Sequence, residues 1–201
     1  MLTRPARPAA GFTLIELMVT IVLLGVLMAL AFPSMSVWIR NARVRTVSDA
    51  LQNGLRLAQS EAMRRSRQTV FSLTNSSAPQ TSLTAVLNGS NWAIHAVPLL
   101  AGETAVFVEA GVLSSAGTDV QISGPAALCF NSVGRLTANT GTGVTGANCS
   151  LPSGTPAVQT YYVSLSGADR PLRVVVALGG QVRMCDPAKT LSSTNPDGCP
   201  S

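Results

Sequence analysis

The feature that most constrains this chain is an uncharged apolar run at residues 17–32, which follows Glu16 and ends before Pro33. Its most polar member is Thr20, a composition that suits either lipid or a fully buried helix. With residues 12–15 the run reaches about 21 residues, roughly the 20 needed to cross about 30 Å of hydrocarbon. The sequence therefore predicts a membrane-spanning helix that contains one charged residue, Glu16.

Glu16 requires an explanation, because an ionised carboxylate near the end of a membrane helix costs on the order of 2.5 kcal/mol or more without a partner. Cleavage after Gly11 would supply that partner. The cut would leave a cationic amine on Phe12, one helical turn from Glu16. The amine could then pair with Glu16 of the same chain or of a neighbouring copy.

The residues around Glu16 resemble the class III signal of type IV prepilins and type II secretion pseudopilins. The resemblance covers about 22 residues, namely the apolar run and Gly11, Phe12, Thr13, Leu14, Ile15, Glu16 and Leu17. It implies that a prepilin peptidase cuts after Gly11 and methylates Phe12, and that Glu16 guides the subunit into a filament. The implied partners are this peptidase, other major and minor pilins or pseudopilins, and the inner membrane.

Two other interpretations compete. An ordinary secretory signal would use Arg4 and Arg7 as its positive region and residues 29–31 as its cleavage site, but its apolar segment would be unusually long and would contain Glu16. A plain membrane anchor is the other interpretation. Counting the arginines on either side of the run would put the C-terminal part in the cytoplasm. The processing motif instead implies a cytoplasmic leader at residues 1–11 and a periplasmic body.

The overall composition favours one small exported domain. The 201 residues leave about 190 after cleavage, enough for a long helix and one globular domain. The net charge of +5 becomes +3 without the two leader arginines. By itself this value is far below the charge density of nucleic-acid-binding proteins.

Four cysteines predict two disulfides, because exported domains fold in an oxidising compartment. Closure between sequence neighbours pairs Cys129 with Cys149 and Cys185 with Cys199, one of three connectivities, with 19 and 13 intervening residues. Each would stabilise the fold by roughly 3 kcal/mol. Zinc is the alternative, but there is no Cys-x-x-Cys pair and His95 is the single histidine, so we expect no metal site.

After the span at residues 12–33, residues 34–66 predict a periplasmic amphipathic helix that continues it, with Pro33 as a kink and not an end. Glu61 and Arg65 have the spacing of a weak helical ion pair on its solvated face, as do Arg45 and Asp49. Apolar side chains recur every three or four residues as one stripe, which a domain must cover: Val44, Val47, Leu51, Leu55, Ala58 and Ala62.

Residues 67–201 predict a β-rich globular domain with a disulfide-tied C-terminal tail. Runs rich in β-branched and aromatic residues alternate with Gly, Ser, Thr, Asn and Pro. The predicted strands are residues 69–73, 92–97, 104–109, 120–123, 127–130, 161–166, 172–178 and 181–185. Together they predict an α+β, type IV pilin-like fold, in which a long N-terminal helix packs on an antiparallel sheet.

The clearest predicted hairpin turns at Gly179 and Gly180, because glycines accept the positive φ angles of a tight turn. A two-residue turn pairs the strands on either side of it in a definite register. That register would place Val175, Ala177, Val182 and Met184 on one face and Gln181 and Arg183 on the other.

Residues 55–65, leading into residues 69–73, resemble the end of the helix and the first strand of the GspH/FimT (FimU) group of minor pilins. The competing interpretation is a generic helix that ends in a solvated basic cluster of Arg64, Arg65 and Arg67. The group implies either a minor pilin of a type IV pilus, acting in assembly, adhesion, twitching or DNA uptake, or a minor pseudopilin of type II secretion. The cysteines and residues 180–187 look more like the pilus members, which favours the first.

No motif indicates an enzyme or a cofactor. Three glycines at residues 141–146 have dinucleotide-binding spacing, but they lie in a predicted loop and not between a strand and a helix. His95 lies in an alternating strand pattern, with no candidate nucleophile near it in sequence. We therefore expect a structural or interaction protein with no catalytic residues.

The resemblance to the GspH/FimT group implies DNA as a further possible partner. DNA-binding FimT members carry a Gly-Arg-x-Arg motif near this hairpin, which Gly180 and Arg183 match, but Gln181 replaces the first arginine. The candidate DNA-binding residues are therefore Arg183 and Lys189, and two nearby aspartates offset their charge. Each lost phosphate contact reduces by about 0.9 the steepness with which the logarithm of the DNA-binding constant falls with the logarithm of salt concentration. We therefore expect at most weak, salt-sensitive binding.

The processing site gives the first testable prediction. Cleavage between Gly11 and Phe12 removes the arginine-bearing leader and keeps Glu16 with the whole apolar helix. Intact-mass measurement of protein extracted from membranes should show the loss of eleven residues and the gain of one methyl group. A mature N-terminus after Ala31 would instead identify an ordinary secretory signal.

Overall fold

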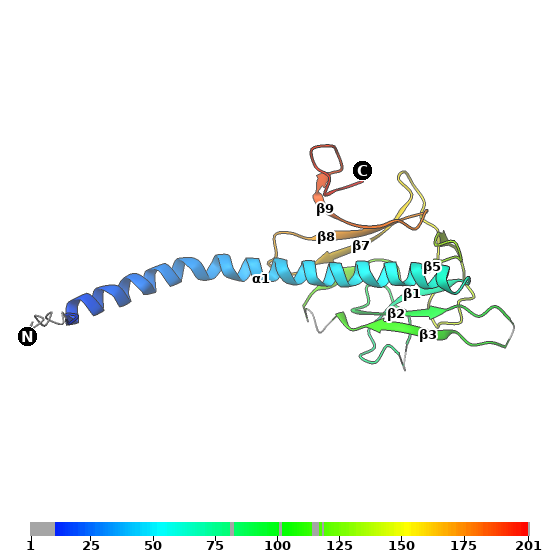
Figure 1. Cartoon of the computed structure of the whole chain (residues 1–201), viewed down its shortest axis with the longest axis horizontal. Coiled ribbons are helices and arrows are strands. Elements are labelled where there is room, and N and C mark those ends of the chain that lie inside the picture. The colour runs from blue at the N-terminus through cyan, green and yellow to red at the C-terminus, as the bar shows by residue number, and fades with distance from the viewer. Residues whose placement is uncertain (1–10, 81–82, 101, 114–116, 118, 201) are drawn as a thin grey trace, which may run out of the picture. The chain divides into compact units, whose positions relative to one another are not determined.

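The computed structural model describes residues 11–80, 83–100, 102–113, 117 and 119–200, without the side chains of residues 30, 31, 33 and 34. The chain divides into two compact units, Met1–Trp38 and Ile39–Ser201. One helix, α1 (Leu14–Arg64), contributes to both units, and every described strand lies in the second (Figure 1). As predicted, the helix does not end at Pro33.

Local sequence sets both ends of α1. At the start, the hydroxyl oxygen of Thr13 accepts the backbone N–H of Glu16 at 3.3 Å and caps the first turn. At the end, Ser66 takes a positive φ of 51°, and the N–H of Arg67 donates to the carbonyl oxygen of Ala62 at 3.2 Å. This arrangement satisfies helix carbonyls that would otherwise lack donors and turns the chain toward the first strand.

The predicted apolar stripe of α1 is buried in the second unit. Ser48 lies within the stripe, and its hydroxyl donates to the carbonyl oxygen of Val44, so this buried polar group has a partner. The six predicted stripe residues are all at most 1% exposed: Val44, Val47, Leu51, Leu55, Ala58 and Ala62. The periodicity therefore identified the packed face correctly.

The strands form two five-stranded sheets. The first has the order β3-β2-β1-β5-β6 and contains β1 (Thr69–Thr74), β2 (Asn91–Ala96), β3 (Val106–Gly111), β5 (Ala127–Phe130) and β6 (Leu136–Thr137). The second has the order β10-β9-β8-β7-β4 and contains β4 (Gln121–Ser123), β7 (Val158–Ser164), β8 (Leu172–Ala177), β9 (Val182–Thr190) and β10 (Gly198–Cys199). Neighbouring strands are antiparallel except β9 and β10, which are parallel. The α+β fold is therefore confirmed, with two sheets against the helix.

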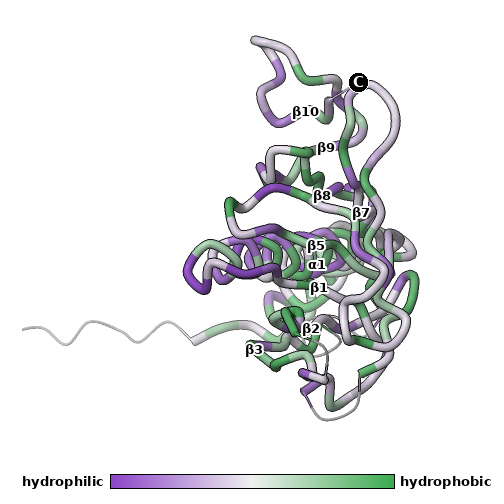
Figure 2. Tube along the Cα trace, turned by 90° about the vertical axis from the view of Figure 1, so that its right-hand side faces the viewer, coloured by the Kyte–Doolittle hydropathy of each residue, from purple (hydrophilic) through white to green (hydrophobic). Residues whose placement is uncertain are grey.

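The sheets lie on opposite sides of α1, with β7, β8 and β9 above it and β1, β2 and β3 below it in Figures 1 and 2. One hydrophobic cluster joins helix and sheets. At its centre the ring of Phe71 lies 5.6 Å from that of Trp92 and 6.2 Å from that of Tyr161, which belongs to the other sheet. Gly54 lets the helix approach, because a Cβ there would be 2.8 Å from the Trp92 indole.

The loop of the β8–β9 hairpin is one residue longer than predicted. Ala177 and Gln181 close it through a backbone bond of 3.0 Å, so Leu178, Gly179 and Gly180 form the loop. Of the two glycines only Gly180 has a positive φ, of 89°. Three-residue loops with one left-handed glycine are common in hairpins, and the Gly-Gly pair in the sequence does not distinguish them from two-residue turns.

The extra loop residue shifts the predicted pairing, so Val175 and Ala177 do not share a face with Val182 as predicted. Val176 pairs with Val182, and Val175 pairs with Arg183. Val174, Val176 and Val182 therefore join the main core, while Val175 joins a small cluster on the other face with Cys185 and Cys199. A one-residue slip moves every side chain of a strand to the opposite face.

Both disulfides have the connectivity expected from closure between sequence neighbours. Cys129 pairs with Cys149, which joins β5 to the loop after β6. Cys185 pairs with Cys199, which joins β9 to β10 and holds the C-terminal tail. Strands β6 and β10 were not predicted, because segments of two residues carry no periodicity.

Gly180 gives a stability prediction. A Cβ at Gly180 would lie 1.9 Å from the carbonyl oxygen of Gly134 and 2.4 Å from Nε2 of Gln59, and the backbone has a positive φ. We expect Gly180→Ala to lower the free energy of unfolding by about 2–4 kcal/mol. Urea unfolding of the full chain in non-ionic detergent, followed by near-ultraviolet circular dichroism, measures the change.

Gly179→Ala is the matched control for this prediction. No heavy atom lies within 4 Å of a Cβ at Gly179, and its φ is outside the positive range. Its unfolding free energy should stay within about 0.5 kcal/mol of the unsubstituted chain. Equal midpoints for the two variants would contradict the loop assignment.

Candidate functional site

The residues implicated in processing and assembly lie at the start of α1. Gly11 and Phe12 precede the helix and are exposed, and Glu16 is exposed in its first turn. A carboxylate there is favoured by the partial positive charge of the helix N-terminus. The spacing of Thr13 and Glu16 is that of a capping box, a signal that our sequence reasoning missed. The leader residues Arg4 and Arg7 lie outside the described residues.

The first unit presents its apolar side chains outward. Every residue from 11 to 29 is exposed, including Phe12 at 88% and Leu14 at 76%. In the described part of the chain, no helix combines the length and the apolarity of a candidate membrane span. Exposed apolar surface on this scale marks a site of interaction with protein or lipid.

Glu61 binds two arginines near the C-terminal end of α1. Its carboxylate lies 2.6 Å from Nη2 of Arg64 and 2.8 Å from Nε of Arg65, the second being the ion pair predicted from spacing. The hydrogen bonds from the two guanidinium groups lower the pKa of Glu61 from 4.5 to about 2. The pairing therefore stabilises the folded chain above about pH 4.5, and this contribution is lost as the pH falls toward 2.

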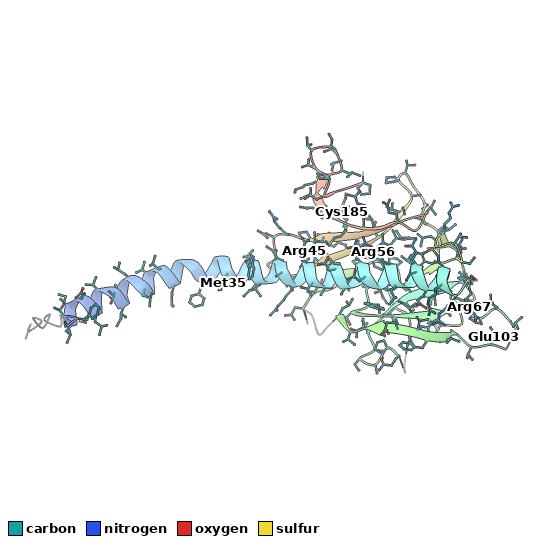
Figure 3. All side chains as sticks on the ribbon, in the orientation of Figure 1. Met35, Arg45, Arg56, Arg67, Glu103 and Cys185 are labelled. Carbon is teal, nitrogen blue, oxygen red and sulfur yellow. A yellow bond between two sulfur atoms is a disulfide. The ribbon has the colours of Figure 1, made fainter. Side chains whose placement is uncertain are left out.

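Arg67 is not part of a solvated basic cluster. Its Nη2 donates to the carbonyl oxygen of Val97 at 2.7 Å and to the carboxylate of Glu103 at 3.0 Å. Figure 3 labels Arg67 and Glu103. Glu103 also accepts the N–H groups of Leu99 and Leu100. These backbone bonds, with the Arg67 guanidinium, hold the pKa of Glu103 below its usual value. Arg67 thus fastens the loop after β2 to the end of the helix.

Other polar side chains of α1 hold loops of both sheets. Nε2 of Gln59 donates at 2.8 Å to the carbonyl oxygen of Gly134, between β5 and β6. Nη2 of Arg56 donates at 3.2 Å to the carbonyl oxygen of Val182 in β9. The sequence did not reveal these contacts, because helical periodicity shows which face is polar and not which loop reaches it.

The two candidate DNA-binding residues are engaged within the chain. Nη2 of Arg183 donates to the carbonyl oxygens of Pro196 at 2.8 Å and Gly198 at 3.3 Å. Lys189 forms an ion pair with Asp197, which lowers the pKa of the Asp197 carboxyl. Both cations therefore help the nearby disulfide to hold the tail against β9.

The residues considered as candidates for catalysis or nucleotide binding are packed against, or hydrogen-bonded to, other parts of the fold. His95 is 8% exposed, its ring lies 5.6 Å from that of Phe107, and burial lowers its pKa. The glycines at 141–146 lie in a loop, where the hydroxyl of Thr142 donates to the carbonyl oxygen of Ala147. Over the described residues, no group of three or more His, Cys, Asp or Glu side chains could hold a metal.

Two models of known protein families match the sequence and define its class. The prokaryotic N-terminal methylation motif matches residues 6–32, so the chain has the signature of a filament subunit that a prepilin peptidase processes. A second model, that of type II transport protein GspH, matches residues 47–180. The chain therefore belongs to the GspH family, whose members are pilins and pseudopilins, that is, structural subunits. A search of curated proteins found no match.

Solved structures with related folds include minor pilins and GspH. Two crystal forms of the type IV minor pilin FimU from Pseudomonas aeruginosa match at 14% and 15% identity, covering 71% and 75% of this chain and 96% of theirs, with TM-scores of 0.45 and 0.49. The solution structure of Escherichia coli GspH matches at 12% identity, covering 77% of this chain and 95% of that one, with a TM-score of 0.41. The family assignment rests on the sequence models.

The contacts of Arg183 predict how the tail responds to its removal. Arg183→Ala deletes the donor to two tail carbonyls, so amide hydrogen exchange in residues 191–200 should become at least severalfold faster. Arg173→Ala is the matched control, because Arg173 lies over the ring of Tyr162 on β7. Mass spectrometry of the full chain measures both. Equal exchange in the two variants would show that Arg183 does not hold the tail.

Proposed function

We propose that this chain is a minor pilin of a type IV pilus, cut between Gly11 and Phe12 and N-methylated there, which acts in assembly or at the tip of the filament. Twitching, adhesion and DNA uptake are the activities this role would serve, the last through at most weak DNA binding. The observation that carries the proposal is the outward-facing apolar surface of the first unit with Glu16 as its one charged side chain among residues 12–29.

The distribution of buried residues supports this role. Within the described chain, the buried hydrophobic residues begin at Val44 and all belong to the second unit. The apolar side chains of residues 12–29 therefore contribute nothing to this core. They remain available to lipid before assembly and to neighbouring subunits after it.

The inner membrane is the proposed location before assembly, with one span at residues 12–33 and the rest of the chain in the periplasm. The support is the uncharged run at 17–32, which includes Leu30 and Ala31, whose side chains lie outside the description. Two disulfides fit an oxidising compartment on the far side of that membrane. A leader at 1–11, a periplasmic half-helix at 34–66 and a globular domain at 67–201 complete the proposed organisation.

A minor pseudopilin of type II secretion is the second candidate function. The GspH model, which carries the name of that transport system, favours it. The resemblance of residues 180–187 and the cysteines to pilus members favours the pilus. Deleting the gene distinguishes the two, because loss of surface pili supports the first and loss of protein secretion with normal pili supports the second.

The role of Glu16 can be tested by substitution. Glu16→Ala should leave the chain folded and membrane-inserted, since removing a charge eases insertion, but should reduce its recovery in sheared filaments at least tenfold. The reason is the loss of the proposed ion pair with the amine of Phe12 on a neighbouring subunit. Immunoblots of the filament and membrane fractions measure both quantities.

Met18→Ala is the matched control for Glu16→Ala. Met18 is exposed in the same apolar segment and carries no charge. Its substitution should leave filament recovery within about twofold of the unsubstituted chain. Normal recovery of the Glu16 variant would show that no assembly contact depends on this carboxylate.

A further inference from the structure

Three exposed arginines begin the part of α1 that belongs to the second unit. Arg45, which is labelled in Figure 3, lies on α1. Its Nε is 3.9 Å from Oδ2 of Asp49, the limit of an ion pair, and the Arg45 side chain is 69% exposed. Arg40 and Arg43 have no carboxylate partner among the described residues. These two guanidinium groups are one helical turn apart and carry uncompensated positive charge.

The loop between β7 and β8 adds a fourth arginine to this end of the unit. The side-chain oxygen of Asn41 accepts the backbone N–H groups of Asp169 and Arg170, each at 3.2 Å. The guanidinium of Arg40 lies against Gly167, where an added Cβ would be 1.9 Å from Nη1. Folding therefore brings Arg170 to the same end of the unit as the arginines of α1, although about 130 residues separate them.

The acidic groups packed into this region leave the surface cationic. Asp49 faces Arg45, and Asp169 accepts the side-chain amide of Asn41. Asp119 follows two residues after Gly117, where an added Cβ would be 3.6 Å from the Cβ of Arg43. Four arginines against these three aspartates leave a local net charge of +1. The hydrogen bond from Lys189 lowers the pKa of Asp197, and the charge of Arg170 adds to this effect. A surface of this kind fits an anionic partner, and arginine binds phosphate in bidentate geometry.

The sequence on the N-terminal side favours one class of anionic partner. Arg40 stands eight residues after the last member of the apolar run. The residues between include Met35, Trp38 and Ile39, whose side chains are 59%, 69% and 41% exposed. An exposed aromatic residue next to arginines is typical of the membrane–water interface, where the indole lies at headgroup level and the guanidinium reaches phosphate.

We propose that Arg40, Arg43 and Arg170 form a lipid-binding surface for the phosphate groups of anionic phospholipids, in the periplasmic leaflet of the membrane that holds the apolar segment. The inference rests on the proposed function, because it requires that segment to lie in a bilayer. The surface gives an unassembled subunit a salt-sensitive contact with the bilayer, in addition to the apolar one.

Trp38 provides a local reporter for the experiment. The full chain is reconstituted into phosphatidylcholine vesicles in two parallel samples. One contains a trace of brominated phosphatidylglycerol and the other a trace of brominated phosphatidylcholine, and both carry the bromine near the top of the acyl chain. Quenching of Trp38 fluorescence by each brominated lipid gives the relative binding constant of the anionic lipid. The second tryptophan, Trp92, is 7% exposed in the core. A Trp38→Phe variant measures the constant fluorescence of Trp92, which is subtracted.

We expect phosphatidylglycerol to be preferred at least fivefold at low salt, since one cation near an anionic surface is worth about that factor. Arg40→Gln with Arg43→Gln should bring the ratio close to one, and so should 0.5 M salt. Arg135→Gln is the matched control, because Arg135 is also exposed and follows Gly134, which lies beside Gln59 and Met63 near the other end of α1. It should leave the preference unchanged.

The outcomes separate this inference from the proposed function. Equal quenching by both lipids in the unsubstituted chain, or no effect of the double substitution, overturns the lipid surface and leaves the membrane span intact. Absence of Trp38 quenching by either lipid overturns the span itself, and with it the proposed function. A double variant that keeps its lipid preference but is lost from filaments would assign these arginines to an acidic neighbouring subunit.

Discussion

The packing of one apolar stripe of α1 against two sheets is the interaction on which the rest of the second unit depends. Each fully buried valine or leucine of the stripe contributes about 1.5–3 kcal/mol, and both sheets share the resulting core. At the C-terminal end of the stripe Ala58 and Ala62 replace larger side chains, so β1 can approach, and the hydroxyl of Thr69 donates to the carbonyl oxygen of Ala58 at 2.8 Å. Without the helix, both sheets would expose the faces that carry this main cluster.

The two units use apolar side chains in opposite ways. In the second unit the core residues pack against one another, while in the first unit the apolar side chains point outward along residues 11–29. The function proposed above, in which the subunit leaves a bilayer and enters a filament, requires this division, because the surface that changes partners cannot also hold the fold together. The capped helix start at Thr13 and the Schellman-type end at Ser66 allow one helix to serve both purposes.

How much of this could be predicted depended on the range of the interactions. The buried stripe of α1 and the disulfide pairing follow from local patterns, and the structure agrees with both. The β8–β9 register could not be read from the Gly-Gly sequence, because the loop is fixed by the approach of Gly180 to Gly134 and Gln59. The roles of Asn41 and Arg67 were equally hidden, since each binds a loop at least 30 residues away.

Contacts between distant residues also decide which positively charged side chains can bind an external anion. Arg183 matches part of a DNA-binding motif, and Lys189 lies near it in the sequence. In the structure, however, Arg183 binds the carbonyl oxygen of Pro196 and Lys189 pairs with Asp197, so both hold the tail. Hydrogen bonds to Arg183 and an ion pair at Lys189 reduce what either can offer a phosphate. Arg40 has no partner of this kind among the described residues, although no motif marks it. An arginine is available to an external anion when the fold leaves its charge uncompensated, so the interaction surface of this chain is better sought where the helix enters the globular unit than in its C-terminal hairpin.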